Sequence, residues 1–210
     1  MTNGCTVGED EQAGAAGGHR LDRGVMRPAW SEQLIARTLA RQTFEKKNLV
    51  IVPNCNWTGN ECDLLVVTPD LRIIDVEVKI SRSDLKADAK KDKWFHSWDW
   101  KVDGPWDGSY DNSKKRPREW PRKVWKHYYA MPRALWADAL FDALPSERSG
   151  VILLAEQKHG GAPLAATLVR RAAPCKDAER ISAGDAIDIA RLASLRMWET
   201  YERLERLKAA

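Results

Sequence analysis

The sequence predicts a mixed α/β domain in which helices flank a β-sheet. Two observations support this class. β-branched runs alternate with amphipathic helical segments in the order α-β-β-β-α-β-α-β-β-α, and a length of 210 residues suits one domain of ordinary size. The composition is 43% hydrophobic and 30% charged. No run of about 18 apolar residues occurs, which excludes a membrane-spanning helix.

Residues 1–27 differ in composition from the rest of the chain. They are rich in Gly, Ala and acidic residues and lack the apolar core of a signal peptide. We therefore expect a disordered leader before a domain at 28–210. The four cysteines contain no CxxC pair, which indicates neither a disulfide framework nor a zinc ribbon. A cytoplasmic protein is expected.

The first half of the domain contains a predicted helix and three predicted strands. The helix follows Pro28 and covers 30–47. The predicted strands are 49–53, 61–68 and 71–80. Because Pro69 and Asp70 separate the last two, these strands should form an antiparallel hairpin. A turn centred there pairs residue i with about residue 139 − i, which puts Asp63 opposite Val76.

The second half of the domain alternates helices and strands around a long loop. The predicted segments are a helix at 81–94, a loop at 95–121, a strand at 124–131, a helix at 134–144, strands at 150–156 and 162–171, and a helix from 182 to the C-terminus. The last helix carries an apolar stripe that indicates core packing, with a homodimer as the second interpretation.

The positive charge of the chain is local. The net charge is only +4, but residues 79–126 contain 14 Lys or Arg and 8 Asp or Glu, which gives this stretch +6 and the remainder −2. Six of the ten tryptophans lie in or beside this stretch: Trp94, Trp98, Trp100, Trp106, Trp120 and Trp125. Such a basic aromatic loop could bind nucleic acid, or the tryptophans could pack the loop onto the domain.

Ionisable residues alternate along the strand predicted at 71–80. Asp75, Glu77 and Lys79 share one face, whereas the other face is apolar. The hairpin brings Asp63 beside them. Two carboxylates about 4 Å apart repel by roughly 4 kcal/mol at an effective dielectric of 20, and a divalent cation would relieve this. Oxygen ligands favour Mg²⁺ or Mn²⁺. The alternative is a solvated face with cross-strand ion pairs.

The spacing of these residues resembles a known motif. Asp63, followed fourteen positions later by Glu77-Val78-Lys79 on the next strand, is similar to the signature of the PD-(D/E)XK nuclease superfamily, which includes small bacterial and phage members. The order of the surrounding elements is also similar, whereas Cys62 replaces the proline of the motif. The resemblance implies a restriction-endonuclease-like fold.

The resemblance also implies an activity and roles for residues. It implies a Mg²⁺-dependent DNA nuclease in which Glu32, Asp63, Glu77 and the Val78 carbonyl hold the metal and Lys79 is the catalytic lysine. Whether the DNA is single- or double-stranded stays open. The rival interpretation is a catalytically inactive protein of the same fold that binds nucleic acid or a protein partner, such as a phage-encoded inhibitor or assembly factor.

Residues after the catalytic lysine are candidates for contacting the DNA backbone. They are Arg82, Ser83, Lys86, Lys90 and Lys93 on the predicted helix and Lys114, Lys115 and Arg116 in the loop. The helical lysines could equally form an ordinary solvated face. Three further residues are undecided. Asp75 could be a second metal ligand or a partner of Lys79 or Arg82, and His127 and Tyr129 share a strand face that could border the cleft.

Overall fold

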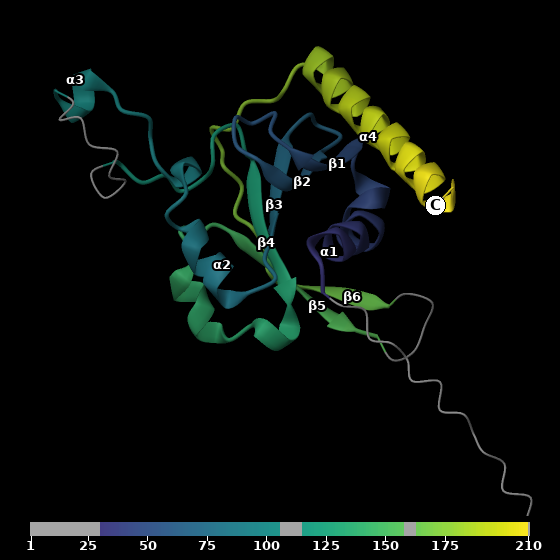
Figure 1. The fold of residues 1–210 in the computed structure, drawn as a ribbon. Coiled ribbons are helices and arrows are strands. Elements are labelled where there is room, and N and C mark those ends of the chain that lie inside the picture. The colour runs from purple at the N-terminus through teal and green to yellow at the C-terminus, as the bar shows by residue number, and fades with distance from the viewer. Residues whose placement is uncertain (1–29, 106–114, 158–162, 210) are drawn as a thin grey trace, which may run out of the picture.

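A six-stranded mixed sheet forms the core of the computed structural model, which describes residues 30–105, 115–157 and 163–209 (Figure 1). The spatial order of the strands follows the chain. The strands are β1 (Val50–Cys55), β2 (Cys62–Val67), β3 (Ile73–Val78), β4 (Lys126–Pro132), β5 (Gly150–Glu156) and β6 (Leu164–Arg170). The expected mixed α/β class is confirmed.

The sheet combines antiparallel and parallel pairs. β1, β2 and β3 form an antiparallel meander, β4 pairs parallel to β3, β5 pairs parallel to β4, and β6 returns antiparallel to β5. A parallel neighbour requires a crossover connection. Between β3 and β4 this crossover contains α2 (Arg82–Asp88), a 3₁₀ turn η3 (Asp92–Trp94) and α3 (Trp100–Asp103). The crossover is what brings polar side chains over β3.

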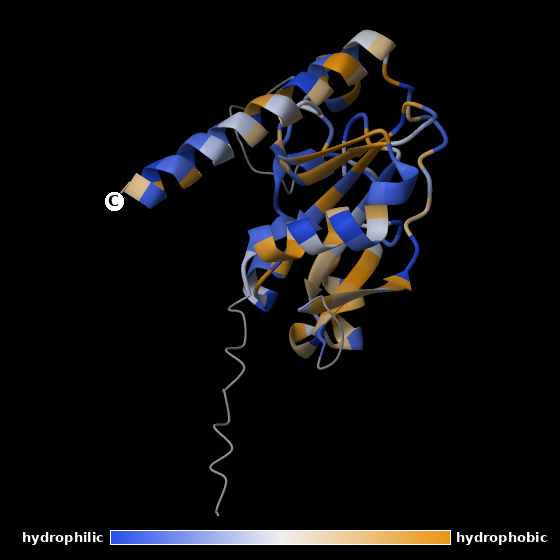
Figure 2. Cartoon of the chain, turned by 90° about the vertical axis from the view of Figure 1, so that its right-hand side faces the viewer, coloured by the Kyte–Doolittle hydropathy of each residue, from blue (hydrophilic) through white to orange (hydrophobic). Residues whose placement is uncertain are grey.

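One face of the sheet is covered by α1 (Glu32–Leu39). Ser31 caps this helix by accepting a hydrogen bond from the Leu34 amide at 3.2 Å. Its apolar residues Ile35 and Leu39 are fully buried in one cluster with Val76 of β3. The chain then continues through a π-helix at Ala40–Phe44 and a 3₁₀ turn at Glu45–Lys47. Figure 2 shows the apolar strands lying beneath mixed helical surfaces.

The opposite face is covered by two separate groups of elements. The start of α4 (Ala183–Ala209) packs on the β1–β2 side, where Ile189 is buried with Val52 and Leu65. On the β4–β5 side, α2 and η3 cover a cluster that includes Leu85, Trp94 and Met131, together with the 3₁₀ turns η5 (Arg133–Leu135) and η6 (Asp138–Ala143). β3 is therefore buried on both faces.

The last helix packs only at its beginning. Its second half extends past the sheet in Figures 1 and 2, and Trp198, Tyr201 and Leu207 are exposed. Core packing of the apolar stripe is thus confirmed for the first turns and wrong for the remainder. Among the described residues, no helix combines the length and apolarity that a membrane span needs.

Three expectations about local structure are wrong. The hairpin register is displaced, because Leu64 rather than Asp63 lies opposite Val76. The turn spans 68–72, where Leu71 has a φ of 60° and the Thr68 amide donates to the Arg72 carbonyl at 2.9 Å. The helix predicted at 81–94 ends at Asp88, and the helix predicted at 134–144 is replaced by η5 and η6.

Candidate functional site

The polar face of β3 lies beneath the crossover. Asp75, Glu77 and Lys79 are each at most 2% exposed. Their alternation with the apolar residues of the opposite face is as predicted, but the interpretation as a solvated face is wrong because α2 and η3 cover them. Burying a charged side chain is costly unless it is paired. The surroundings of these three residues therefore determine what the site can do.

Three lysines neutralise Glu77. Lys79 Nζ lies 2.9 Å from Glu77 Oε2, and Lys93 Nζ lies 2.6 Å from Oε1. Lys91 approaches from the solvent side, with its Nζ 3.5 Å from Oε2 and its side chain 49% exposed. Both carboxylate oxygens thus face ammonium groups, and Lys91 is the one of these three lysines whose side chain is exposed to solvent.

Asp88 is a third buried carboxylate, which was not among the residues expected at the site. It is fully buried at the end of α2, and its Oδ1 lies 3.0 Å from Lys79 Nζ and 2.9 Å from Lys91 Nζ. Its Oδ2 accepts hydrogen bonds from the Tyr129 hydroxyl and, at 3.1 Å, from Trp94 Nε1. One signal pointed to it. Asp88 follows Leu85 by three positions and therefore shares the buried helix face.

The ion pairs fix the charge states of these groups. Burial alone would raise the pKa of Glu77, but the nearby charges of Lys93 and Lys79 outweigh it and lower that pKa to about 2. The same balance lowers the pKa of Asp88. For Lys79, burial opposes protonation, but Glu77 and Asp88 outweigh it and raise the pKa. Lys79 is consequently a fixed positive charge rather than a proton acceptor.

Asp63 is the carboxylate that the lysines do not neutralise. It is half-buried at the start of β2, and its Oδ2 accepts a hydrogen bond from the Val78 amide at 2.7 Å. In the described part of the chain no lysine or arginine lies within 4 Å of it. Burial, followed by the charge of Glu77, raises its pKa to about 6, against the opposing effects of the Val78 hydrogen bond and the more distant charge of Lys79; Glu32 also raises it. Three carboxylates therefore act on one another here, although Glu32 itself is exposed.

The residues fit a hard cation only in part. The donors Asp63, Glu77 and the Val78 carbonyl are all oxygen atoms, which suits Mg²⁺ or Mn²⁺. However, among residues 30–105, 115–157 and 163–209 no three His, Cys, Asp or Glu side chains are grouped closely enough to hold a metal. Lys91 and Lys93 contact the oxygens of Glu77 that a cation would use. A cation that binds there must compete with these two lysines and with Lys79, whose Nζ lies 2.9 Å from Oε2.

The three undecided residues are buried beside Glu77 on β3 and β4 and do not border a cleft. His127 is fully buried, with Nδ1 3.0 Å from Ser149 Oγ and Nε2 3.8 Å from Asp75 Oδ2. Burial lowers the pKa of His127 to about 3 and raises that of Asp75 to about 7, with Glu77 also raising the latter. Tyr129 is equally buried against Asp88. Because all three side chains are buried, a substrate cannot contact them directly.

The predicted nucleic-acid contacts on the crossover are only partly available. Arg82, Ser83, Lys86 and Lys90 are exposed, and Arg82 Nε donates to the Leu135 carbonyl at 2.6 Å. The prediction for Lys93 is wrong. Because α2 ends at Asp88 and the chain turns, Lys93 falls in η3 and is buried against Glu77 instead of extending a solvent-facing stripe.

The predicted contacts in the basic loop are engaged in ion pairs or lie outside the described residues. Lys115 Nζ lies 3.1 Å from Asp92, and Arg116 Nε lies 2.8 Å from Asp103. Lys114 and Trp106 fall outside the described residues.

The tryptophans of the basic stretch have mixed roles. Trp94 is buried beside His127, with ring centroids 4.8 Å apart. Trp120 Nε1 donates to the Ala173 carbonyl at 3.1 Å, and Trp125 packs against the α1-side core. Trp100 is instead 72% exposed. The interpretation of the tryptophans as packing residues thus holds for Trp94, Trp120 and Trp125.

Comparisons with known proteins assign no family. No family model matches the sequence, and no curated protein matches it. Among solved structures, a protein of unknown function from Silicibacter pomeroyi is similar, with 17% identity, coverage of 87% of this chain and 96% of that chain, and a TM-score of 0.48.

The ion network predicts unequal effects for two neighbouring aspartates. Asp88→Ala leaves buried ammonium groups without their partner and should destabilise the protein by about 3–5 kcal/mol. Asp84→Ala removes a carboxylate 3.9 Å from Lys79 that is 40% exposed, and should cost less than about 1 kcal/mol. Urea unfolding followed by circular dichroism measures both. Equal losses would contradict the role given to Asp88.

The raised pKa of Asp75 predicts a pH dependence. Below pH 7 the folded protein holds a proton on Asp75 that the unfolded chain releases near pH 3.8, so this group's contribution to stability decreases as pH rises from about 4 to 7. His127 acts in the opposite direction, so a matched variant is needed. We expect the free energy of unfolding of Asp75→Asn, measured relative to that of the wild type in EDTA, to rise by roughly 2 kcal/mol between pH 5 and pH 8. A stability difference between the two proteins that does not change with pH would contradict the raised pKa of Asp75.

Proposed function

We propose that the protein is a metal-dependent nuclease with a restriction-endonuclease-like core that hydrolyses DNA phosphodiester bonds. One observation carries this proposal. Asp63, Glu77 and Lys79 lie together at adjacent ends of β2 and β3, and the chain order around them is helix, three strands, helix, strand. The resemblance to the PD-(D/E)XK superfamily requires this arrangement of both elements and residues.

The proposed roles follow from the surroundings of each group. Asp63, Glu77 and the Val78 carbonyl would hold Mg²⁺ or Mn²⁺, and the exposed Glu32 would face this site from α1. When bound, the cation supplies Lewis acidity toward the phosphate and lowers the pKa of a bound water. Lys79, protonated and fixed between Glu77 and Asp88, offers a positive charge where negative charge develops on the phosphate.

Asp88 acts in this scheme as a positioning residue. Its Oδ1 holds Lys79 Nζ at 3.0 Å, while Trp94 and Tyr129 fix the carboxylate from the other side. A lysine side chain has four rotatable bonds, and a charge aimed in advance stabilises the transition state better than a mobile one. Asp88 therefore keeps the ammonium group of Lys79 near Glu77 before the substrate arrives.

A second candidate function is favoured by the same lysines. Glu77 and Asp88 are already neutralised by Lys79, Lys91 and Lys93, so the buried charges require no cation. A protein that keeps the fold but binds nucleic acid without cleaving it would look the same. This candidate predicts binding of DNA without turnover in Mg²⁺ or Mn²⁺.

Cleavage assays test the proposed function. Glu77→Gln and Lys79→Met should each lower cleavage of plasmid and single-stranded DNA in Mg²⁺ or Mn²⁺ by about 100-fold or more, because each removes a charge from the reacting centre. Arg203→Ala, which removes an exposed charge from α4, is the control. Near-ultraviolet circular dichroism verifies folding. Unchanged cleavage in either variant would refute the assignment, and binding without cleavage by the wild type would favour the second candidate.

The position of Lys91 predicts a change in metal affinity. Its ammonium group competes for oxygens of Glu77 and Asp88, so Lys91→Ala should bind Mn²⁺ about three- to tenfold more tightly than the wild type. Lys86→Ala, which removes an exposed lysine from the same crossover, should leave the affinity unchanged. Isothermal titration calorimetry without DNA measures both. Equal Mn²⁺ affinities in the two variants would show that Lys91 does not compete with a cation for Glu77.

A further inference from the structure

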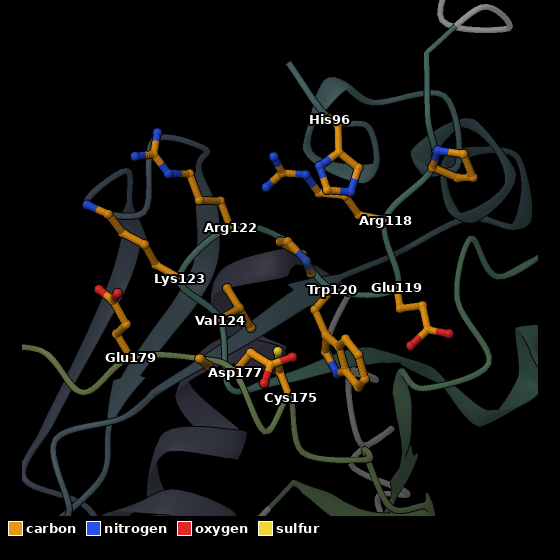
Figure 3. Close-up of a pocket in the computed structure, with 13 residues that line it drawn as sticks. His96, Arg118, Glu119, Trp120, Arg122, Lys123, Val124, Cys175, Asp177 and Glu179 are labelled. Carbon is orange, nitrogen blue, oxygen red and sulfur yellow. The ribbon is translucent and has the colours of Figure 1, made fainter. Parts of the chain in front are cut away.

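A second recess lies at the other end of β4 from the Glu77 site. It is a cavity of about 660 Å³ between residues 117–124, which lead into β4, and residues 175–179, which lead toward α4 (Figure 3). His96, Arg118, Arg122, Trp120, Asp177 and Glu179 are among its lining residues. None of these residues takes part in the proposed chemistry, so the cavity needs an explanation of its own.

One wall of the cavity, the cationic wall, carries Arg118 and Arg122, which have no ion pair among the described residues, and His96, whose pKa is lowered by burial and by the charges of Arg118 and Arg116. His96, Arg118 and Arg122 lie along the same side in Figure 3. Among the described residues, Arg118 Nε is buried without a hydrogen-bond partner, and neither Arg118 nor Arg122 has an ion pair within 4 Å. Burial and the charges of Arg122 and Arg116 lower the pKa of Arg118, which means that these groups repel one another. An anion held between Arg118 and Arg122 would relieve this repulsion.

The cationic wall is held in place by backbone pairing. The His96 amide donates to the Arg116 carbonyl, and the Arg118 amide donates to the Trp94 carbonyl, both at 2.8 Å. Trp94 in turn donates to Asp88 of the candidate site. The wall is thus organised in advance and joined directly to the element that positions Lys79.

The opposite wall carries carboxylates, which narrows the choice of ligand. Asp177 and Glu179 face the cavity from the segment before α4, while Glu119 lies 3.7 Å from Arg148. A simple inorganic anion would meet repulsion from Asp177 and Glu179. A nucleotide, by contrast, has a phosphate at one end and N–H donors on its base at the other, and carboxylates accept hydrogen bonds from such donors. The two walls match these two ends.

We propose that this cavity binds one unpaired nucleotide of a single-stranded DNA segment, with its phosphodiester between Arg118 and Arg122, its base beside Trp120, and a base N–H directed to Asp177. The nucleotide is unpaired because a duplex occupies the Watson–Crick donors of its bases. The inference rests on the proposed function in one respect, since the same strand would continue to the Glu77 site. The preferred substrate of the proposed nuclease would then be single-stranded DNA.

Binding measured without catalysis tests this inference. Fluorescence anisotropy in EDTA compares a labelled single-stranded oligonucleotide with the duplex of the same sequence. The wild type should prefer the single strand, and Arg118→Ala/Arg122→Ala should weaken that binding about tenfold or more. The plot of log association constant against log salt concentration has a negative slope, and its magnitude should decrease by about 0.7 for each lost phosphate contact. The control, Arg37→Ala/Arg203→Ala, removes the same charge from exposed positions on α1 and α4.

Each outcome has a definite meaning. Equal single-strand binding by the double variant and its control would overturn the inference, as would a wild-type preference for duplex. Arg122→Ala alone, at an exposed position, provides the same comparison if the double variant does not fold. If the wild type binds through these arginines but never cleaves DNA, the cavity assignment stands and the nuclease assignment fails.

Discussion

The pairing of two buried carboxylates with three lysines is the interaction on which the rest of the structure depends. Glu77 on β3 and Asp88 on α2 are buried under the crossover, and neither charge could exist there alone. Lys79 lies between the two carboxylates, within 3.0 Å of both. Satisfying this network ends α2 at Asp88 and turns the chain so that Lys93 enters from η3. Local structure here follows from charge balance.

The network also determines what chemistry the site can perform. The charges of Glu77 and Asp88 raise the pKa of Lys79, which favours a role in stabilising negative charge. Asp63 remains the carboxylate beside Glu77 without a neutralising lysine, and its pKa is raised to about 6. A cation that binds there gains Asp63 but must compete with Lys79, Lys91 and Lys93 for the oxygens of Glu77. In the proposed nuclease the cation displaces a lysine from Glu77, whereas in an inactive binding protein the lysines stay paired with it.

The sequence predicted what depends on periodicity and missed what depends on tertiary contacts. The alternation along β3 correctly placed Glu77 and Lys79 on one buried face opposite the α1-side core. Lys93 was placed on a solvent-facing helix because the lysine-rich segment 81–94 has good helical propensity throughout. In the structure α2 ends at Asp88, and Lys93 pairs with the buried Glu77. Asp88 lies inside α2, and its spacing from Leu85 was the only signal in the sequence for its burial. The hairpin register depended on Leu71 adopting a positive φ, which nothing in its side chain favours.

Anomalous diffraction from crystals soaked in Mn²⁺ tests the central claim most directly, because it locates the cation and the lysines in one measurement. We expect a single strong peak bounded by Asp63, Glu77 and the Val78 carbonyl, with Lys91 Nζ withdrawn from Asp88 and Lys79 still between Glu77 and Asp88. Absence of any peak there at saturating Mn²⁺, with all three lysines still paired, would contradict it.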